Sequence, residues 1–204
     1  MKLNLSDLRH LMDNLDALPS EGIQEILTEI LQGNEFIGWE IGPDPIDYAV
    51  TVLALSCHGD KGLLKDLEKD IDFPVVGDCW RIVVGVPPKS WQGYFEIEKD
   101  NGDVIPVEGW SWKWREVERD CNGLTVQVLF PPSPILDKDD IKRAGEVLLF
   151  GTIGEVNVAN LLSVDGYFVI DKNCMDCRSV KHLREEFARG FPEAPYCNEL
   201  MDIK

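Results

Sequence analysis

The stretch GWSWKW, residues 109–114, places three tryptophans at alternate positions and decides which kind of sheet the chain builds. Side chains alternate between the two faces of a β-strand, so Trp110, Trp112 and Trp114 are expected to share one face. The residues between them are polar or cationic, which predicts a strand with one face in the core and the other in solvent. We expect the three rings to pack against a helical layer. The alternative is an exposed aromatic platform that binds a small ligand, because large exposed apolar patches usually serve a purpose.

Runs of alternating or β-branched residues on both sides of this stretch predict an antiparallel β-meander. Residues 79–86, 91–98 and 124–130 have the composition of strands, and residues 103–118 hold either one long strand or two short ones. Asp100-Asn101-Gly102 is a strong hairpin turn signal. Strands joined by such short turns pair in sequence order.

The N-terminal third of the chain has the spacing of helices. Apolar residues recur at three- and four-residue intervals after Ser6 and again after Ser20, and either serine can cap a helix. The pair Asp44-Pro45 is typical of a helix start and predicts a buried helix over 46–57, although the β-branched residues there leave a strand open. Asp60 would cap a short helix that follows.

The C-terminal part mixes both element types. Asp137 predicts the start of a helix, and residues 154–162 fit either a helix or a strand. Residues 166–171 have the pattern of a strand and residues 179–190 that of a helix. The sequence therefore predicts an α+β fold with an N-terminal helical region, a central antiparallel β-meander and a C-terminal mixed α/β segment.

Negative charge is the main compositional feature. The formal net charge is −17, and residues 1–72 hold 15 acidic against 5 basic side chains. We therefore divide the chain into an acidic helical region, 1–72, and an antiparallel sheet with C-terminal helices, 73–204, unless both belong to one continuous domain. Such a surface repels phosphate backbones and anionic lipid, so we expect neither a nucleic acid nor a membrane as partner. It favours encounter with another, basic protein, or it only keeps the chain soluble.

Three carboxylates mark a candidate docking face. Glu21, Glu25 and Glu29 recur at i, i+4 and therefore lie on one face of the second predicted helix, away from its apolar stripe. The Lys and Arg side chains of a basic protein would be attracted to such a row. The alternative interpretation is an ordinary solvated helix surface.

A cysteine cluster near the C-terminus has the character of a metal site. Cys174 and Cys177 have the C-x-x-C spacing that presents two thiolates to zinc, and His182 and Cys197 could complete a tetrahedral site. The alternative is thiol chemistry, in which Asn173 caps a helix that lowers the pKa of the Cys174 thiol. Otherwise the two cysteines only pack at a helix start, and the protein needs no cofactor.

These features predict a non-enzymatic protein-interaction module, of the inhibitor or immunity type, that binds a basic partner. The sequence shows no combination of residues that indicates a catalytic site. A zinc-containing or thiol-dependent enzyme built on Cys174 and Cys177 is the second hypothesis, and a small-ligand binder built on the tryptophan face is the third. The N-terminus MKLNLSDLRH has no signal-peptide core, and the longest apolar run, 49–55, is far too short to span a bilayer, so we expect a cytoplasmic protein.

Overall fold

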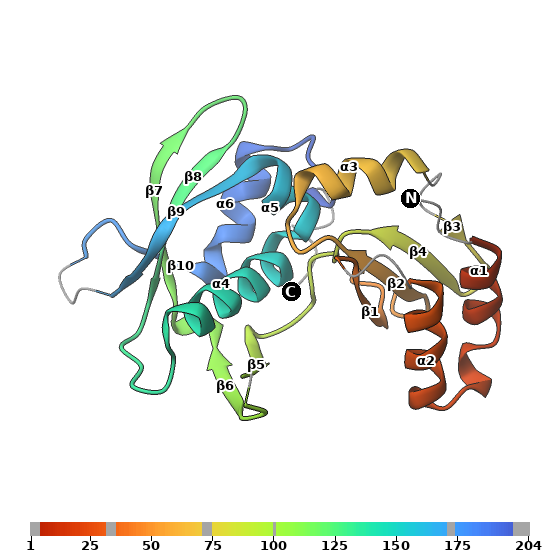
Figure 1. The fold of residues 1–204 in the computed structure, drawn as a ribbon. Coiled ribbons are helices and arrows are strands. Elements are labelled where there is room, and N and C mark those ends of the chain that lie inside the picture. The colour runs from red at the N-terminus through yellow and green to blue at the C-terminus, as the bar shows by residue number, and fades with distance from the viewer. Residues whose placement is uncertain (1–4, 32–35, 71–74, 100, 171–173, 198–204) are drawn as a thin grey trace. The chain divides into compact units, whose positions relative to one another are not determined.

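The computed structural model describes residues 5–31, 36–70, 75–99, 101–170 and 174–197 (Figure 1). The chain forms two compact units, Met1–Val86 and Pro87–Lys204. The first unit extends past residue 72, because a strand at 80–84 pairs with a strand at 51–56. Each unit has its own sheet and its own helices.

The first unit combines two N-terminal helices with a four-stranded sheet. Its elements are α1 (Leu5–Asp13), η1 (Leu15–Ala17), α2 (Ser20–Ile30), β1 (Gly38–Pro43), β2 (Thr51–Ser56), α3 (Lys61–Asp70), β3 (Val75–Val76) and β4 (Trp80–Val84), where η marks a short 3₁₀ helix. The strand order is β1-β2-β4-β3, with β2 and β4 parallel and the two outer pairs antiparallel. A parallel pair needs a crossover connection, and α3 supplies it between β2 and β4.

The helices predicted near the N-terminus are confirmed as α1 and α2. Their buried side chains recur at the predicted spacing: Leu8, Leu11, Met12 and Leu27. Asp60 caps α3 as predicted, since its Oδ1 accepts the backbone N–H groups of Gly62 at 2.8 Å and Leu63 at 3.0 Å. The predicted caps Ser6 and Ser20 are wrong, because the two serines lie inside α1 and α2 and do not precede them.

The predicted helix over 46–57 is wrong. This segment contains β2, whose residues from Val52 to Ser56 are buried because the strand lies between β1 and β4 in the sheet. An apolar run that is buried on both faces has no alternation, so periodicity alone cannot distinguish it from a buried helix. Asp44 does act as a cap, but of a turn: its Oδ1 accepts the backbone N–H groups of Ile46 at 2.8 Å and Asp47 at 3.0 Å.

The second unit builds another four-stranded sheet and a separate hairpin. Its elements are β5 (Tyr94–Glu98), β6 (Val104–Glu108), η2 (Gly109–Ser111), β7 (Lys113–Arg119), β8 (Leu124–Phe130), α4 (Lys138–Ile153), α5 (Glu155–Leu161), β9 (Leu162–Val169), β10 (Arg178–Ser179), η3 (Val180–His182) and α6 (Leu183–Gly190). The order in the larger sheet is β10-β7-β8-β9, with β8 and β9 parallel and the other two pairs antiparallel. Strands β5 and β6 pair with each other in a hairpin.

The α+β class is confirmed, and the sequence correctly predicts the antiparallel pairs β5–β6 and β7–β8. The two pairs belong to different sheets, because the 3₁₀ turn η2 separates β6 from β7. The strand predicted at 79–86 is β4, which pairs with β2 and β3 of the first unit, so pairing in sequence order holds only within the two hairpins. Gly109 permits this turn: a Cβ there would lie 2.5 Å from Leu148 Cδ1 and 2.9 Å from the carbonyl oxygen of Gly93. Strand β9 then joins β8 in parallel after two intervening helices, a pairing that no local pattern indicates.

The core of the second unit lies between the inner face of its sheet and the helices α4 and α6. Its buried side chains include Trp112, Trp114, Val126, Val128, Leu148 and Phe187. Helix α4 begins where the sequence predicts, since Asp137 Oδ1 accepts the N–H groups of Asp139 at 2.9 Å and Asp140 at 3.0 Å. Asp140 Oδ2 in turn accepts the Asp137 N–H at 3.1 Å and completes a capping box. No helix in the described part of the chain is long and apolar enough to cross a membrane.

Candidate functional site

Helix α2 presents a polar surface that we name the α2 acidic face. It consists of Glu21, Gln24, Glu25, Thr28 and Glu29, which are all exposed and line an open hollow. The helix directs this face away from the core because its apolar stripe occupies another side, where Leu27 is fully buried. The structure thus brings together on one exposed surface the three carboxylates that the sequence singled out.

The carboxylates of the α2 acidic face have no cationic partner among the residues that the structure describes. Within the described residues, Glu21, Glu25 and Glu29 form no ion pair. On α3, by contrast, the exposed Asp66 carboxylate lies 3.5 Å from Lys69 Nζ. Like charges at i, i+4 destabilise an isolated helix by about 0.2–0.5 kcal/mol per pair. The row therefore carries an intrinsic repulsion that a bound cation would relieve.

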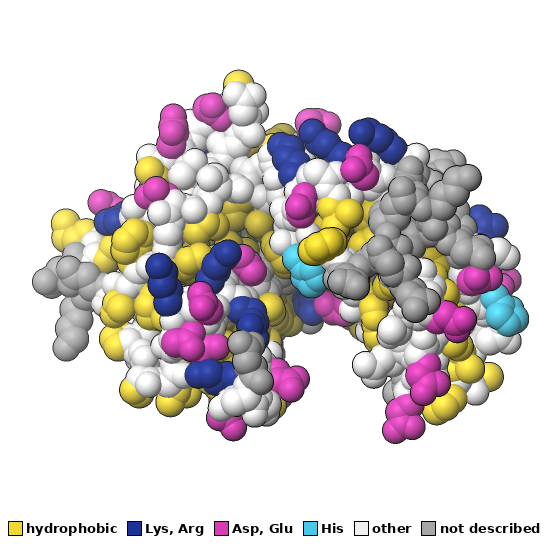
Figure 2. Space-filling model, in the orientation of Figure 1, with side chains coloured by type: hydrophobic (Ala, Val, Ile, Leu, Met, Phe, Trp, Pro, Cys, Tyr) yellow, Lys and Arg dark blue, Asp and Glu magenta, His cyan; other side chains and the backbone are white. Residues whose placement is uncertain are grey.

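The sequence around α2 supplies no cation of its own. The chain contains no lysine or arginine from His10 to Asp60, a stretch that also includes β1 and β2. Figure 2 shows acidic side chains, in magenta, over the region of α2. Exposed charges within a Debye length of about 8 Å act together at physiological ionic strength. The α2 acidic face itself consequently carries charge of a single sign.

A second exposed surface of the first unit is the constrained loop between β1 and β2, which presents apolar side chains. Between β1 and β2, Tyr48 is 64% exposed and Ile46 is 49% exposed. Buried Asp44 holds the loop, because it pairs with Arg81 of β4 and its N–H donates to the carbonyl oxygen of Val50 at 2.8 Å. The sequence interpretation missed this loop because it assigned the cap signature to a helix. Exposed tyrosines on preorganised loops are frequent anchors in protein interfaces.

The tryptophan row lies mostly in the core. Trp112 and Trp114 are 2% and 0% exposed, so the packing interpretation is confirmed for these two. Trp110 belongs to η2, is half-buried, and has Lys181 Nζ 4.9 Å from its ring centroid. The expectation that all three rings share one strand is wrong, because β7 begins only at Lys113. The row is therefore not an exposed platform for a small ligand.

The four residues of the predicted zinc site do not come together. Cys174 and Cys177 are joined by a disulfide, His182 ends η3, and Cys197 is 2% exposed. The described residues contain no group of three or more His, Cys, Asp or Glu side chains that could hold a metal ion. A turn and then β10 follow Cys174, so the helix start expected there is wrong. Asn173, the predicted cap, lies outside the described residues.

A half-buried arginine that the sequence interpretation did not single out has an architectural role. Arg184 of α6 donates from Nε to the carbonyl oxygen of Thr152 at 2.9 Å. Its Nη2 donates to the carbonyl oxygens of Lys89 at 2.7 Å and Gly151 at 3.3 Å. Burial lowers the pKa of the Arg184 guanidinium. The side chain thus ties the end of α4 and the segment at Lys89 to α6, and we do not assign it to a site.

Comparison with known proteins assigns no family: no protein-family model, no curated protein and no solved structure matches the chain. Of the surfaces described above, the α2 acidic face and the β1–β2 loop are the two candidates for contact with a partner protein.

Proposed function

We propose that this protein is a non-enzymatic interaction module of the inhibitor or immunity type, whose α2 acidic face binds a basic partner protein in the cytoplasm. The observation that carries the proposal is the exposed row of carboxylates at Glu21, Glu25 and Glu29, which form no ion pair with any described residue. Successive carboxylates are one helical turn apart, about 6 Å along the axis. The partner would carry lysine or arginine side chains at a similar spacing, and its binding would replace repulsion by attraction.

The charge of the whole chain supports a basic protein over other partners. A net charge of −17 repels nucleic acid and anionic lipid and attracts cationic surfaces. Complementary charge mainly raises the association rate and excludes wrong partners, whereas packed apolar anchors supply most of the affinity. Tyr48 and Ile46 on the β1–β2 loop are suited to the second role.

The first experiment identifies the partner and then tests the α2 acidic face. The tagged full-length protein is used to capture partners from a lysate of its source cells at low and moderate salt. Binding of the captured protein is then measured by titration calorimetry for the wild type and for a triple variant, Glu21→Lys, Glu25→Lys and Glu29→Lys. We expect affinity to fall at least about tenfold at low salt, equivalent to about 1.4 kcal/mol. The difference should shrink as salt rises, because salt screens exposed charges.

A second charge-reversal variant is the matched control. Glu96→Lys, Glu98→Lys and Glu108→Lys make the same change in net charge on the β5–β6 hairpin, where the three side chains are exposed and form no ion pair among the described residues. This variant should bind almost as the wild type does. Equal weakening by both variants would show that net charge alone acts, and unchanged affinity in the α2 variant would refute the site.

A further inference from the structure

A disulfide joins Cys174 and Cys177 on an exposed turn of the second unit. The two residues between them form the turn, and Met175 is 95% exposed. Both cysteines are themselves partly exposed, so dissolved molecules can reach the bond. Within the described residues, no disulfide includes any of the other four cysteines: Cys57, Cys79, Cys121 and Cys197. Oxidation is therefore confined to the one pair that lies close together in the sequence.

The neighbouring backbone has other contacts that hold it in place. A bridge across two intervening residues constrains the unfolded chain much less than a bridge that closes a long loop. Directly after the pair, Ser179 lies opposite Lys113 in the sheet, and the Val180 N–H donates to the carbonyl oxygen of Trp112 at 3.1 Å. Val180 is also fully buried. We therefore expect this segment to keep its place when the disulfide is broken.

We propose that the Cys174–Cys177 pair is a redox-active site that undergoes thiol–disulfide exchange with a dithiol reductant. A thiolate of the reductant attacks one sulfur, the S–S bond breaks, and the released cysteine leaves as a thiolate that takes a proton from water. The second thiol of the reductant loses its proton and attacks the mixed disulfide, which releases the other cysteine. The protein disulfide gains two electrons and two protons, and the dithiol is oxidised to a disulfide.

Neighbouring charges favour the disulfide over free thiolates. Asp176 lies between the two cysteines and is exposed, and its carboxylate disfavours a thiolate nearby. The adjacent cation, Arg178, is engaged elsewhere: its Nη1 lies 3.2 Å from a Glu186 carboxylate oxygen, and its guanidinium carbon lies 5.1 Å from the centroid of the Trp114 ring. A neutral dithiol should therefore react faster at this turn than an anionic thiol such as glutathione.

A redox titration of the full-length protein tests the proposal. The protein is equilibrated in mixtures of reduced and oxidised dithiothreitol, and free thiols are blocked with iodoacetamide. Trypsin releases residues 173–178 as one peptide, so mass spectrometry reads both cysteines together. We expect the pair to switch as a two-electron unit while the far-UV circular dichroism spectrum stays unchanged. Asp176→Asn should accelerate reduction roughly threefold, because the attacking and leaving thiolates are no longer repelled.

The double variant Cys79→Ser, Cys121→Ser removes the two exposed free thiols and is the matched control. It should titrate as the wild type does. If Cys174 and Cys177 remain open to alkylation after treatment with oxidised glutathione, the disulfide does not form in solution and the proposal fails. It also fails if the pair resists reduction until urea unfolds the protein, since the bond is then a structural one. Both results are independent of partner binding by the α2 acidic face.

Discussion

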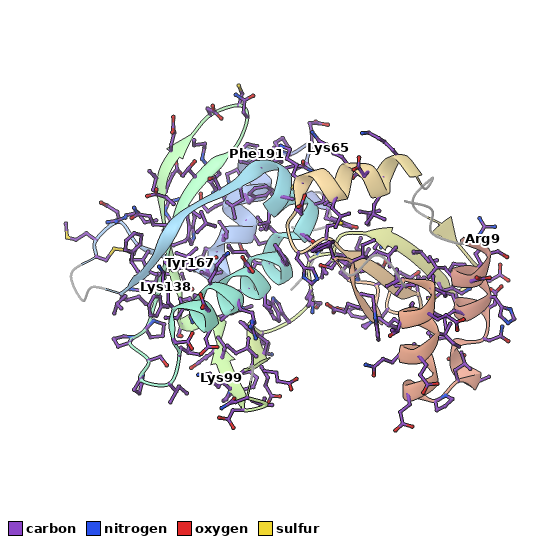
Figure 3. The ribbon with its side chains drawn as sticks, in the orientation of Figure 1. Arg9, Lys65, Lys99, Lys138, Tyr167 and Phe191 are labelled. Carbon is purple, nitrogen blue, oxygen red and sulfur yellow. A yellow bond between two sulfur atoms is a disulfide. The ribbon has the colours of Figure 1, made fainter. Side chains whose placement is uncertain are left out.

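At the scale of single residues, close packing between Tyr167 and Gly145 excludes a larger side chain at position 145. Tyr167 of β9 lies against α4 (Figure 3), and its ring fills the space next to Gly145. A Cβ at Gly145 would lie 2.2 Å from Tyr167 Cε1. Burial raises the pKa of Tyr167 well above its ordinary value, because the phenolate loses its hydration there. The glycine is thus required by its neighbour although it lies within a helix.

We expect Gly145→Ala to destabilise the protein by about 1–3 kcal/mol, the usual range for overpacking a core. Gly22→Ala in α2 is the matched change, since its Cβ would meet only Pro19, at 3.5 Å. That variant should gain up to about 1 kcal/mol, because alanine has the higher helix propensity. Urea unfolding of both variants measures the two effects. A Gly145→Ala variant as stable as the wild type would contradict the packing of Tyr167 on α4.

At the scale of elements, an ion pair links the β5–β6 hairpin to the start of α4. Lys99, labelled in Figure 3, directly follows β5, and its Nζ lies 2.9 Å from Asp140 Oδ2. Arg143 adds a hydrogen bond from Nη1 to the carbonyl oxygen of Glu98 at 2.6 Å. The hydrogen bond from Lys99 lowers the pKa of the Asp140 carboxyl.

This ion pair predicts a pH-dependent contribution to stability. Because the pKa of Asp140 is lowered in the folded protein, its contribution is complete above the ordinary carboxyl pKa and is lost as pH falls through the lowered one. Asp140→Asn keeps an oxygen that can accept the Asp137 N–H but removes the charge. The variant should be less stable than the wild type at about pH 6, and the two free energies of unfolding should converge toward about pH 2. A difference that does not change with pH would show that the charge of Asp140 contributes nothing.

The sequence predicted best those helices and strands whose start or turn is set by residues within a few positions. Helices α3 and α4 have side-chain caps at Asp60 and Asp137, and a cap acts within one turn of its own backbone. The β5–β6 hairpin follows from its turn signal Asp100-Asn101-Gly102. The β7–β8 hairpin has a local turn of its own, in which Asp120 Oδ1 accepts the Gly123 N–H at 2.9 Å. Strand β2 had no such signal, because its identity depends on the two strands that flank it.

At the scale of the whole molecule, the division into units predicts which fragments fold. Residues 1–86 contain β4, which pairs with β2 and β3 and carries Trp80, whose Nε1 donates to Asp13 Oδ1 at 2.9 Å. Residues 1–72 lack β4 and would leave β2 with an open edge. We expect the 1–86 fragment to unfold cooperatively in urea and the 1–72 fragment to show no cooperative transition. Cooperative unfolding of the shorter fragment would support the boundary drawn from the sequence instead.

By itself the sequence determined the charge, the capped helices, the hairpins and the carboxylate row of α2, since each depends on residues a few positions apart. The tertiary structure alone decided the strand identity of β2, the parallel pairing of β9 with β8, and the constrained loop anchored by Asp44 and Arg81. It also decided that Trp112 and Trp114 are buried and that Trp110 is half-buried. Cys174 forms a disulfide with Cys177, and the two do not form a metal site with His182 and Cys197. Contacts between distant segments must overcome the loss of entropy that comes with closing a long loop. The packing of the whole core supplies the free energy for this, so these contacts cannot be predicted from any short stretch of sequence.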